Sequence, residues 1–318
     1  MVVKHLFSYL KRFKPVHWAY NLLHLKNLRH NQEAYKRYSI NKPLFGSISS
    51  RDFPDRASRA WLDCGDSREL APAHPSFAQL PAALQEQVLN WSQQGYILWK
   101  SGLPEERVDA INAAIDQILA KGQIAITHDN KLPFANRLSD TIRNTTCDPE
   151  ILSVLQFLLG KEVVPFQTLN FIKGSNQRAH SDSIHMTTYP LGYLIAVWIA
   201  LEDTNEKSGP LFYYPGSHRL PYLLNNDFEQ TSSLLQLGKK DYRDYEDVVE
   251  EILQRNTFEQ KIFLAKKGDL FIWHANLIHG GLPIVDHSLT RKSMVIHYYA
   301  KDVIKYHEIT ERPSLMQD

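Results

Sequence analysis

From about Val163 onward, the chain consists of short apolar segments separated by turn-forming residues. The turn formers include K-S-G-P, P-G-S-H and K-K-G-D. Helical patterns come before this region, and many short strands after helices indicate a β-barrel or sandwich with flanking helices. We predict strands over residues 164–172, 193–201, 210–214, 261–264, 269–273 and 293–300.

The helical part is clearest between Leu84 and Gly122. A short helix ends at Gly95, and a second begins at Pro104, a residue that suits the first turn of a helix. The second helix buries one apolar face, formed by Val108, Ile111, Ile115 and Ile118.

Two segments rich in turn formers, 46–60 and 71–83, are typical of connectors. We therefore expect residues 1–80 to form a helical, basic extension with its linker, and residues 81–318 to form the main domain. A charged, helical insertion is expected at about 238–260, between two strands.

Residues 1–41 carry eight Lys or Arg and a single acid, Glu33. Apolar residues recur among them at helical spacing, at Val3, Leu6, Phe7, Leu10 and Phe13. One interpretation is a basic amphipathic helix that lies on an anionic membrane or on a glycolipid substrate. The other is an arm packed on its own domain or on a partner subunit.

The composition places few limits on function. A net charge of +1 gives no reason to expect nucleic acid as a partner. Cys64 and Cys147 are far apart, which fits a reducing compartment and argues against a disulfide framework. No apolar run reaches the roughly 18–20 residues of a transmembrane helix, and no secretory signal is apparent. We expect a cytoplasmic protein, membrane-peripheral if residues 1–41 contact lipid; nothing in the sequence gives the oligomeric state.

His180 and Asp182 stand two residues apart directly after a predicted strand, so both side chains can point to one face. With 14 histidines, about one such H-x-D match is expected by chance, so the pair needs support from elsewhere. His274 and His279 can supply a third ligand, and two histidines with one carboxylate are typical of non-heme Fe(II) oxygenases. Arg291 offers a planar fork for a carboxylate, as a keto-acid cosubstrate requires.

At this point the sequence resembles the phytanoyl-CoA dioxygenase family of Fe(II)- and 2-oxoglutarate-dependent oxygenases. The resemblance extends from about Gly95 to Tyr299. Its motifs are H-S-D at 180–182, V-W-I-A-L-E-D-T at 197–204, S-G-P-L-F-Y-Y-P-G-S-H at 208–218, G-D-L-F-I-W-H-A-N-L-I-H-G-G at 268–281 and T-R-K-S at 290–293.

The resemblance implies a mostly β fold with flanking helices, in which a double-stranded β-helix (jelly-roll or cupin-like) core follows a helical N-terminal extension. It makes His180, Asp182 and His279 the iron ligands, and it places Arg291 on the far carboxylate of 2-oxoglutarate. Trp198 and Leu169 fall on strand positions that line the cosubstrate pocket. The cofactors implied are Fe(II), 2-oxoglutarate and O₂.

One position departs from the family pattern. Many members carry a serine two residues after the distal histidine, where its hydroxyl assists the cosubstrate carboxylate. This chain has Gly281 there, so the contact is either missing or supplied elsewhere, for example by Ser293.

Four other histidines are not expected to bind the metal. His274 is expected to be a packed strand residue, His218 to stabilise a turn and His297 to belong to the core. His185 is close enough to the H-S-D motif to contact substrate, but its direction does not follow from the sequence.

The function implied is hydroxylation of an unactivated C–H bond in a small-molecule or lipid-type substrate, with release of succinate and CO₂. Two alternatives stay open: a catalytically silent barrel that binds a ligand, and a barrel metalloenzyme of other chemistry. The latter would not need Arg291.

Overall fold

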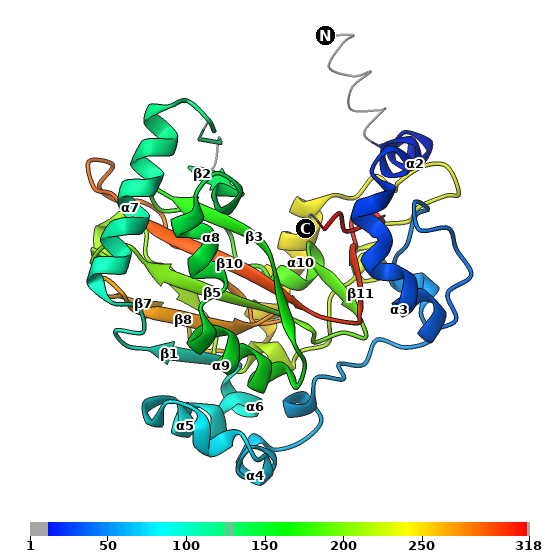
Figure 1. The fold of residues 1–318 in the computed structure, drawn as a ribbon. Coiled ribbons are helices and arrows are strands. Elements are labelled where there is room, and N and C mark those ends of the chain that lie inside the picture. The colour runs from blue at the N-terminus through cyan, green and yellow to red at the C-terminus, as the bar shows by residue number, and fades with distance from the viewer. Residues whose placement is uncertain (1–11, 125, 128–129, 317–318) are drawn as a thin grey trace.

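The centre of the fold is a six-stranded antiparallel sheet with the strand order β1-β8-β5-β10-β3-β2 (Figure 1). The computed structural model describes residues 12–124, 126–127 and 130–316. The apolar pattern predicted at Val3, Leu6, Phe7 and Leu10 therefore lies outside the described residues. The strands of this sheet are β1 (Tyr96–Trp99), β2 (Lys131–Pro133), β3 (Val163–Phe171), β5 (Leu194–Ala200), β8 (Leu270–His274) and β10 (Ser293–Ala300).

Two three-stranded sheets complete the β structure, with the orders β7-β6-β9 and β12-β11-β4. All six predicted strand segments are strands. The members of the two small sheets are β4 (Thr187–Tyr189), β6 (Leu211–Tyr213), β7 (Lys261–Phe263), β9 (His279–Gly281), β11 (Ile304–His307) and β12 (Arg312–Pro313).

Strand β5 is buried on both faces, which explains its continuous apolar sequence. Ile195, Val197 and Ile199 pack in the cluster that the helices cover. Ala196, Trp198 and Ala200 alternate with them and face the small sheet, where Leu211 and Phe263 belong to the same cluster. The prediction of a β-sandwich with flanking helices is therefore confirmed.

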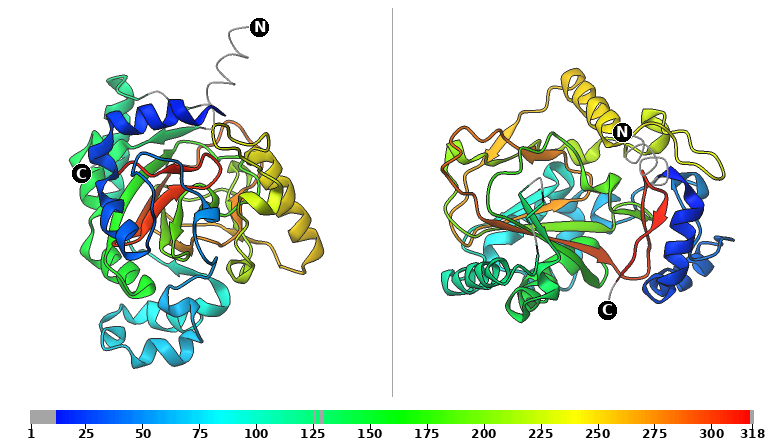
Figure 2. Two further views of the ribbon diagram at one scale, coloured as in Figure 1. Left: turned by 90° about the vertical axis from the view of Figure 1, so that its right-hand side faces the viewer. Right: turned by 90° about the horizontal axis from the view of Figure 1, so that it is seen from above.

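Helices cover the outer face of the large sheet (Figures 1 and 2). The predicted helix after Pro104 is α7, and it buries the four predicted apolar residues. The charged insertion is α10, which lies on the opposite side of the sandwich from α7 (Figure 2). The helices after residue 60 are α4 (Ser67–Ala73), α5 (Ala82–Leu89), α6 (Trp91–Gln94), α7 (Glu105–Ala120), α8 (Asp140–Thr146), α9 (Pro149–Leu159) and α10 (Tyr242–Arg255). None of the described helices is both long and apolar enough to cross a membrane.

The arm before residue 50 packs against the C-terminal strands (Figure 1). Its elements are α2 (Lys14–Leu23), the 3₁₀ helix η1 (Leu25–Asn31) and α3 (Gln32–Arg37). Ala34, Tyr35 and Ile48 form one buried cluster with residues of β4 and β11. The Asn31 side chain bonds the backbone of Lys305 in both directions, at 3.1 and 2.9 Å. Residues 12–41 thus pack on their own chain, which is one of the two interpretations of the arm.

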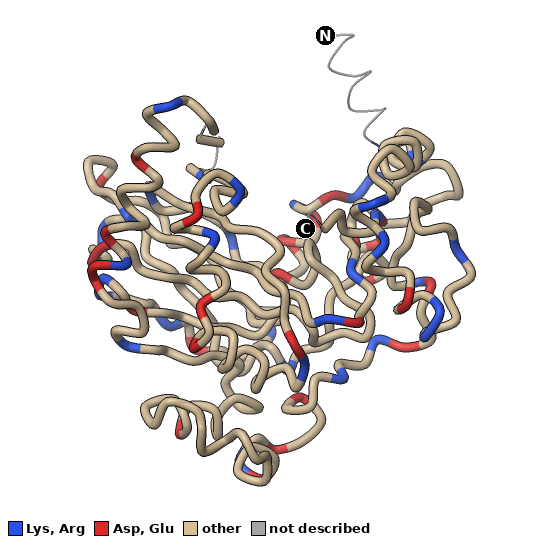
Figure 3. Tube along the Cα trace, viewed as in Figure 1, with Lys and Arg blue, Asp and Glu red and all other residues tan. Residues whose placement is uncertain are grey.

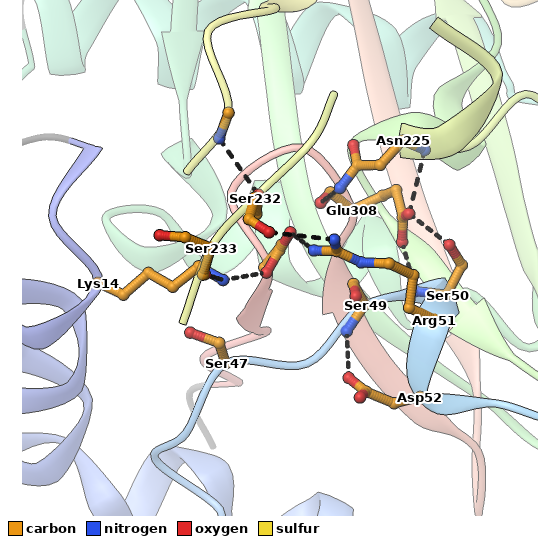
Figure 4. A network of polar contacts seen from close by, with 12 residues as sticks. Lys14, Ser47, Ser49, Ser50, Arg51, Asp52, Asn225, Ser232, Ser233 and Glu308 are labelled. Carbon is orange, nitrogen blue, oxygen red and sulfur yellow. Dashed lines mark hydrogen bonds and ion pairs between the residues drawn. The ribbon is translucent and has the colours of Figure 1, made fainter. Parts of the chain in front are cut away.

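Two buried glutamates, Glu308 and Glu311, fix the arm. Figure 4 shows Glu308 together with Lys14 and Arg51. Glu311 forms an ion pair with Lys14 at 2.6 Å and another with Arg51. Glu308 accepts hydrogen bonds from the backbone and hydroxyl of Ser50 and from the backbone of Asn225. Burial raises the pKa of Glu308, and these donors lower it in part. Basic positions dominate the arm, and acidic positions join them in the loop that follows residue 50 (Figure 3). The contacts of Glu308 and Glu311 cross the boundary predicted at residue 80.

Candidate active site

His180, Asp182 and His279 come together at one end of the sandwich. Their ligand atoms all lie within 4.8 Å of one another, and all three residues are buried. The Asp182 Oδ1 atom lies 3.8 Å from Nε2 of His180 and 3.8 Å from Nε2 of His279. One oxygen thus faces both ring nitrogens, as a shared metal ion requires.

Backbone structure brings these residues together. His180 pairs with His279 in an antiparallel bridge, which adds a segment to the edge strand β9. Asp182 was predicted to continue the strand, but it begins a 3₁₀ turn, η6 (Asp182–Ile184). The turn still directs the carboxylate toward the two rings. Ser181, which lies between the two ligands in the sequence, points away from them, and its hydroxyl contacts those of Ser183 and Tyr245.

Each histidine ring is oriented by a hydrogen bond from its inner nitrogen. His180 Nδ1 donates to the carbonyl of Arg178 at 2.9 Å, and His279 Nδ1 donates to that of Leu277 at 3.0 Å. Both Nε2 atoms are then left with a lone pair, which is the arrangement found in metal-binding histidines. Burial and the neighbouring His279 lower the pKa of His180 to about 3, although Asp182 opposes this, so the ring is neutral at pH 7.

Asp182 remains ionised in spite of its burial. Burial alone would raise the pKa of this carboxyl, but His279 and His297 lower it well below its usual range. Oδ2 accepts a hydrogen bond from Trp273 Nε1 at 2.8 Å and lies 3.4 Å from His297 Nε2. The site therefore offers one fixed negative charge and two imidazole nitrogens, a donor set that fits Fe(II).

The Gln177 side chain touches the same site. Its amide Nε2 lies 3.0 Å from His180 Nε2 and 3.3 Å from the hydroxyl of Tyr242. A metal ion on His180 would use the lone pair that this amide now contacts. The Tyr242 hydroxyl would remain available to Gln177.

Arg291 lies deep in the same cavity and makes few contacts. It is 3% exposed, and its guanidinium donates to the carbonyl of Gly209 at 3.2 Å. Its Nε atom is buried without a hydrogen-bond partner. Burial lowers the pKa of Arg291 to about 10, so the group is charged at pH 7. A buried arginine with spare donors fits the carboxylate of 2-oxoglutarate.

The two other residues predicted for the cosubstrate pocket also line the cavity, which has a volume of about 600 Å³. Trp198 lies 5.8 Å from the Arg291 guanidinium, and its Nε1 atom is buried without a partner. Leu169 is on β3, opposite Val295 of β10.

The space beside Gly281 is filled by another hydroxyl. A Cβ atom at Gly281 would lie 2.3 Å from Oγ of Ser175, which lines the cavity. Ser293, the substitute considered from the sequence, is fully buried, and its hydroxyl has no partner. It is not among the described residues that line the cavity. Ser175 could have been found only through its position in space, since nothing in its local sequence marks it.

The remaining histidines fall into two groups. His274 lies outside the triad, as predicted, and its Nε2 contacts Asp63 at 3.0 Å; the buried His218 lies beside it. His185 and His297 both line the cavity. The expectation that His297 is simply core was wrong, because the alternation of β10 that directs Val295 inward directs His297 inward as well.

A sandwich of antiparallel sheets that holds two histidines, an aspartate and a buried arginine defines a class of protein, the non-heme iron oxygenases that take a keto-acid cosubstrate. A model of the phytanoyl-CoA dioxygenase (PhyH) family matches residues 91–292. The chain belongs to this family, whose enzymes use Fe(II), 2-oxoglutarate and O₂.

Individual relatives are distant. The chain is 24% identical over 170 residues to phytanoyl-CoA dioxygenase domain-containing protein 1 of Danio rerio, a match that covers 50% of this chain and 54% of the relative. The chain thus spans about half the length of that curated relative.

Two solved structures share the fold. The carbocyclase SnoK from nogalamycin biosynthesis superposes with a TM-score of 0.58 at 18% identity, over 76% of this chain and 95% of that chain. EctD from S. alaskensis with 2-oxoglutarate and 5-hydroxyectoine gives 0.56 at 19% identity, over 80% and 86%. The predicted jelly-roll core is therefore confirmed.

Proposed function

We propose that the chain is an Fe(II)- and 2-oxoglutarate-dependent dioxygenase that hydroxylates an unactivated C–H bond of a small-molecule or lipid-type substrate. The observation that carries this proposal is the presence of the His180–Asp182–His279 cluster and the sparsely bonded Arg291 in one cavity. Iron and 2-oxoglutarate, when bound, supply an oxidation in which O₂ hydroxylates the substrate and converts the keto acid to succinate and CO₂.

The residues of the chain have distinct tasks in this proposal. His180, Asp182 and His279 hold the metal ion through two neutral nitrogens and one carboxylate oxygen. Arg291 holds the far carboxylate of the cosubstrate through a charged pair, which is strong in a buried site. Ser175 supplies the hydroxyl that Gly281 cannot, while Trp198 and Leu169 confine the cosubstrate and exclude water.

An anaerobic titration with Fe(II) and 2-oxoglutarate tests the proposal. The parent protein should develop the visible charge-transfer band of an iron-chelated keto acid. Arg291→Ala should bind iron but weaken 2-oxoglutarate, because loss of a buried charged contact typically costs about 2–5 kcal/mol. Arg291→Lys should recover part of the affinity, since lysine keeps the charge but lacks the planar fork.

Two outcomes would favour the alternatives. Iron binding without the band would favour a barrel metalloenzyme of other chemistry. A band without succinate formation, across a library of metabolites and lipids under O₂, would favour a silent binding module.

Three further statements are part of the proposal. The main domain spans residues 81–318, with 1–80 as an extension that docks on it. The protein is cytoplasmic.

Residues 1–41 contact anionic lipid at the membrane surface. This contact would be salt-sensitive, and vesicle co-sedimentation in low and high salt tests it.

A further inference from the structure

Besides Arg291, the catalytic cavity is lined by two further arginines, Arg137 and Arg312, which come from separate elements. Arg137 ends the 3₁₀ helix η5 (Ala135–Arg137), which follows strand β2, and Arg312 is in β12. Arg137 is exposed, Arg312 is half-buried and Arg291 is 3% exposed. One guanidinium is therefore deep in the cavity, and the other two lie toward its opening.

Neither outer arginine forms an ion pair with a described residue. The Arg137 guanidinium stacks 3.8 Å from the ring of Phe134. That of Arg312 donates to Asn21 Oδ1 at 3.3 Å and lies 5.2 Å from the Tyr20 ring. Seven arginines elsewhere pair with carboxylates: Arg51, Arg56, Arg59, Arg107, Arg143, Arg178 and Arg255.

The cavity offers these cations no acid of its own. Among the described lining residues, Asp182 is the only carboxylate, and it belongs to the metal cluster. Burial lowers the pKa of Arg137 and of Arg312, although Tyr20 opposes the shift in Arg312, and guanidinium groups remain charged at neutral pH. Among the described residues that line the outer cavity, no carboxylate therefore pairs with Arg137 or Arg312.

Apolar surface lies beside these charges. Phe134 and Phe166 meet edge to face, with ring centroids 6.5 Å apart, and Leu315 also lines the cavity. A ligand that fits both features carries an anionic group on an apolar body. Arginine recognises carboxylate and phosphate through the same planar fork.

We propose that Arg137 and Arg312 form an anion-binding subsite for the substrate, separate from Arg291, and that the substrate is a carboxylate or phosphate with an apolar body. This proposal rests on the proposed function, because it assigns the outer cavity to the substrate of that reaction. Tyr20 and Phe134 hold the two guanidinium groups in place through their ring faces.

Calorimetric titration of the full chain without iron tests the subsite independently of catalysis. The probes are 3-phenylpropanoate, phenyl phosphate and the neutral 3-phenylpropanamide. We expect at least one anionic probe to bind about tenfold or more tightly than the amide, a difference of about 1.4 kcal/mol. The tighter of the two anions identifies carboxylate or phosphate as the group recognised.

Matched variants locate the binding. Arg137→Gln and Arg312→Gln should each weaken the anionic probe by about tenfold or more, whereas Arg312→Lys should retain part of the binding, because lysine keeps the charge but lacks the planar fork. Arg68→Gln is the control, because Arg68 is exposed and bonds only the neutral Asn90. Arg291→Ala should leave probe binding unchanged, and thermal unfolding of every variant checks the fold.

The proposal is overturned if no anionic probe binds, if the amide binds equally well, or if Arg291→Ala removes binding as strongly as Arg137→Gln. That last result would place the probe in the cosubstrate site. The anaerobic band with 2-oxoglutarate reports separately on the proposed function, and it should survive in Arg137→Gln and Arg312→Gln. Loss of the band in the parent protein would refute the proposed function while the calorimetry still decides the subsite.

Discussion

The backbone amides of His180 and His279 each donate to the carbonyl of the other residue, at 2.9 Å in both directions. Two ring nitrogens from distant parts of the chain are thereby held on one face of a small sheet. The positions of the candidate ligands depend on backbone pairing, so a side-chain substitution can remove a ligand without moving its neighbour.

His279→Ala should abolish most Fe(II) binding and leave the fold intact, because the backbone bridge does not need the imidazole. His274→Ala should keep iron but lower the free energy of unfolding by about 1–3 kcal/mol, since Asp63 loses a buried partner. Metal content after gel filtration and denaturant unfolding measure the two effects. Equal iron content in both variants would contradict the ligand assignment.

Asp182→Asn should fold, because the amide can still accept the Trp273 hydrogen bond, yet it should lose most affinity for Fe(II) together with the negative charge. The matched control is Ser181→Ala. We expect it to bind iron normally but to be about 1 kcal/mol less stable, because the Ser181 hydroxyl is buried against Tyr245. Iron titration followed by calorimetry separates the two variants, and full iron affinity in Asp182→Asn would refute the assignment.

Ser175→Ala should weaken 2-oxoglutarate by about tenfold, the effect of losing a hydrogen bond to a charged group. Gly281→Ser should also be impaired, since its Cβ would lie 2.3 Å from Ser175 Oγ. The double variant Ser175→Ala/Gly281→Ser should recover affinity, because it removes the obstacle and restores a hydroxyl. Anaerobic titration of the charge-transfer band measures all three, and a double variant no better than either single one would count against Ser175.

Stability should fall as the pH is lowered from about 6.5 to about 4. Burial lowers the pKa of His180 and of His185 to about 3 and that of His307 to about 4. Neighbouring cationic groups add to these shifts, whereas Asp182 opposes those of His180 and His185. In this range the unfolded chain binds protons that the folded chain excludes, so each buried histidine costs on the order of 2 kcal/mol at about pH 5.

Denaturant unfolding of the metal-free protein at the two ends of this range measures how the free energy of unfolding depends on pH. His185→Gln should weaken this pH dependence, whereas substitution of the exposed His287 should leave it unchanged. Equal stability at both pH values would contradict the burial of neutral imidazoles.

The central strands of the large sheet, β5, β8 and β10, could be predicted because they are buried on both faces, which leaves largely apolar runs such as the one around Trp198. That His180, Asp182 and His279 lie together could be predicted from the H-S-D spacing together with the ordered family motifs. These features depend on local pattern, and local pattern is visible in a sequence.

Other parts of the site depend on contacts between distant segments. Ser175 is defined by its approach to Gly281. Arg137 and Arg312 line the same cavity only because η5 and strand β12, which are far apart in the sequence, both border it. His297 was assigned to the core because the sequence pattern of an inward-facing strand residue is the same whether its side chain packs against other side chains or lines a cavity. Spatial relationships of this kind leave no periodic signal in the sequence.

The docking of the arm also constrains the order in which the parts of the protein can fold. Lys14 pairs with Glu311, Asn31 with Lys305, and Tyr20 with Arg312. During synthesis the arm leaves the ribosome before residues 304–316, so it can dock only after that segment has also been made. His180 and His279 are synthesised earlier than that segment, so the candidate metal ligands can assemble in a nascent chain before the residues of β11 and β12 that border the cavity are made.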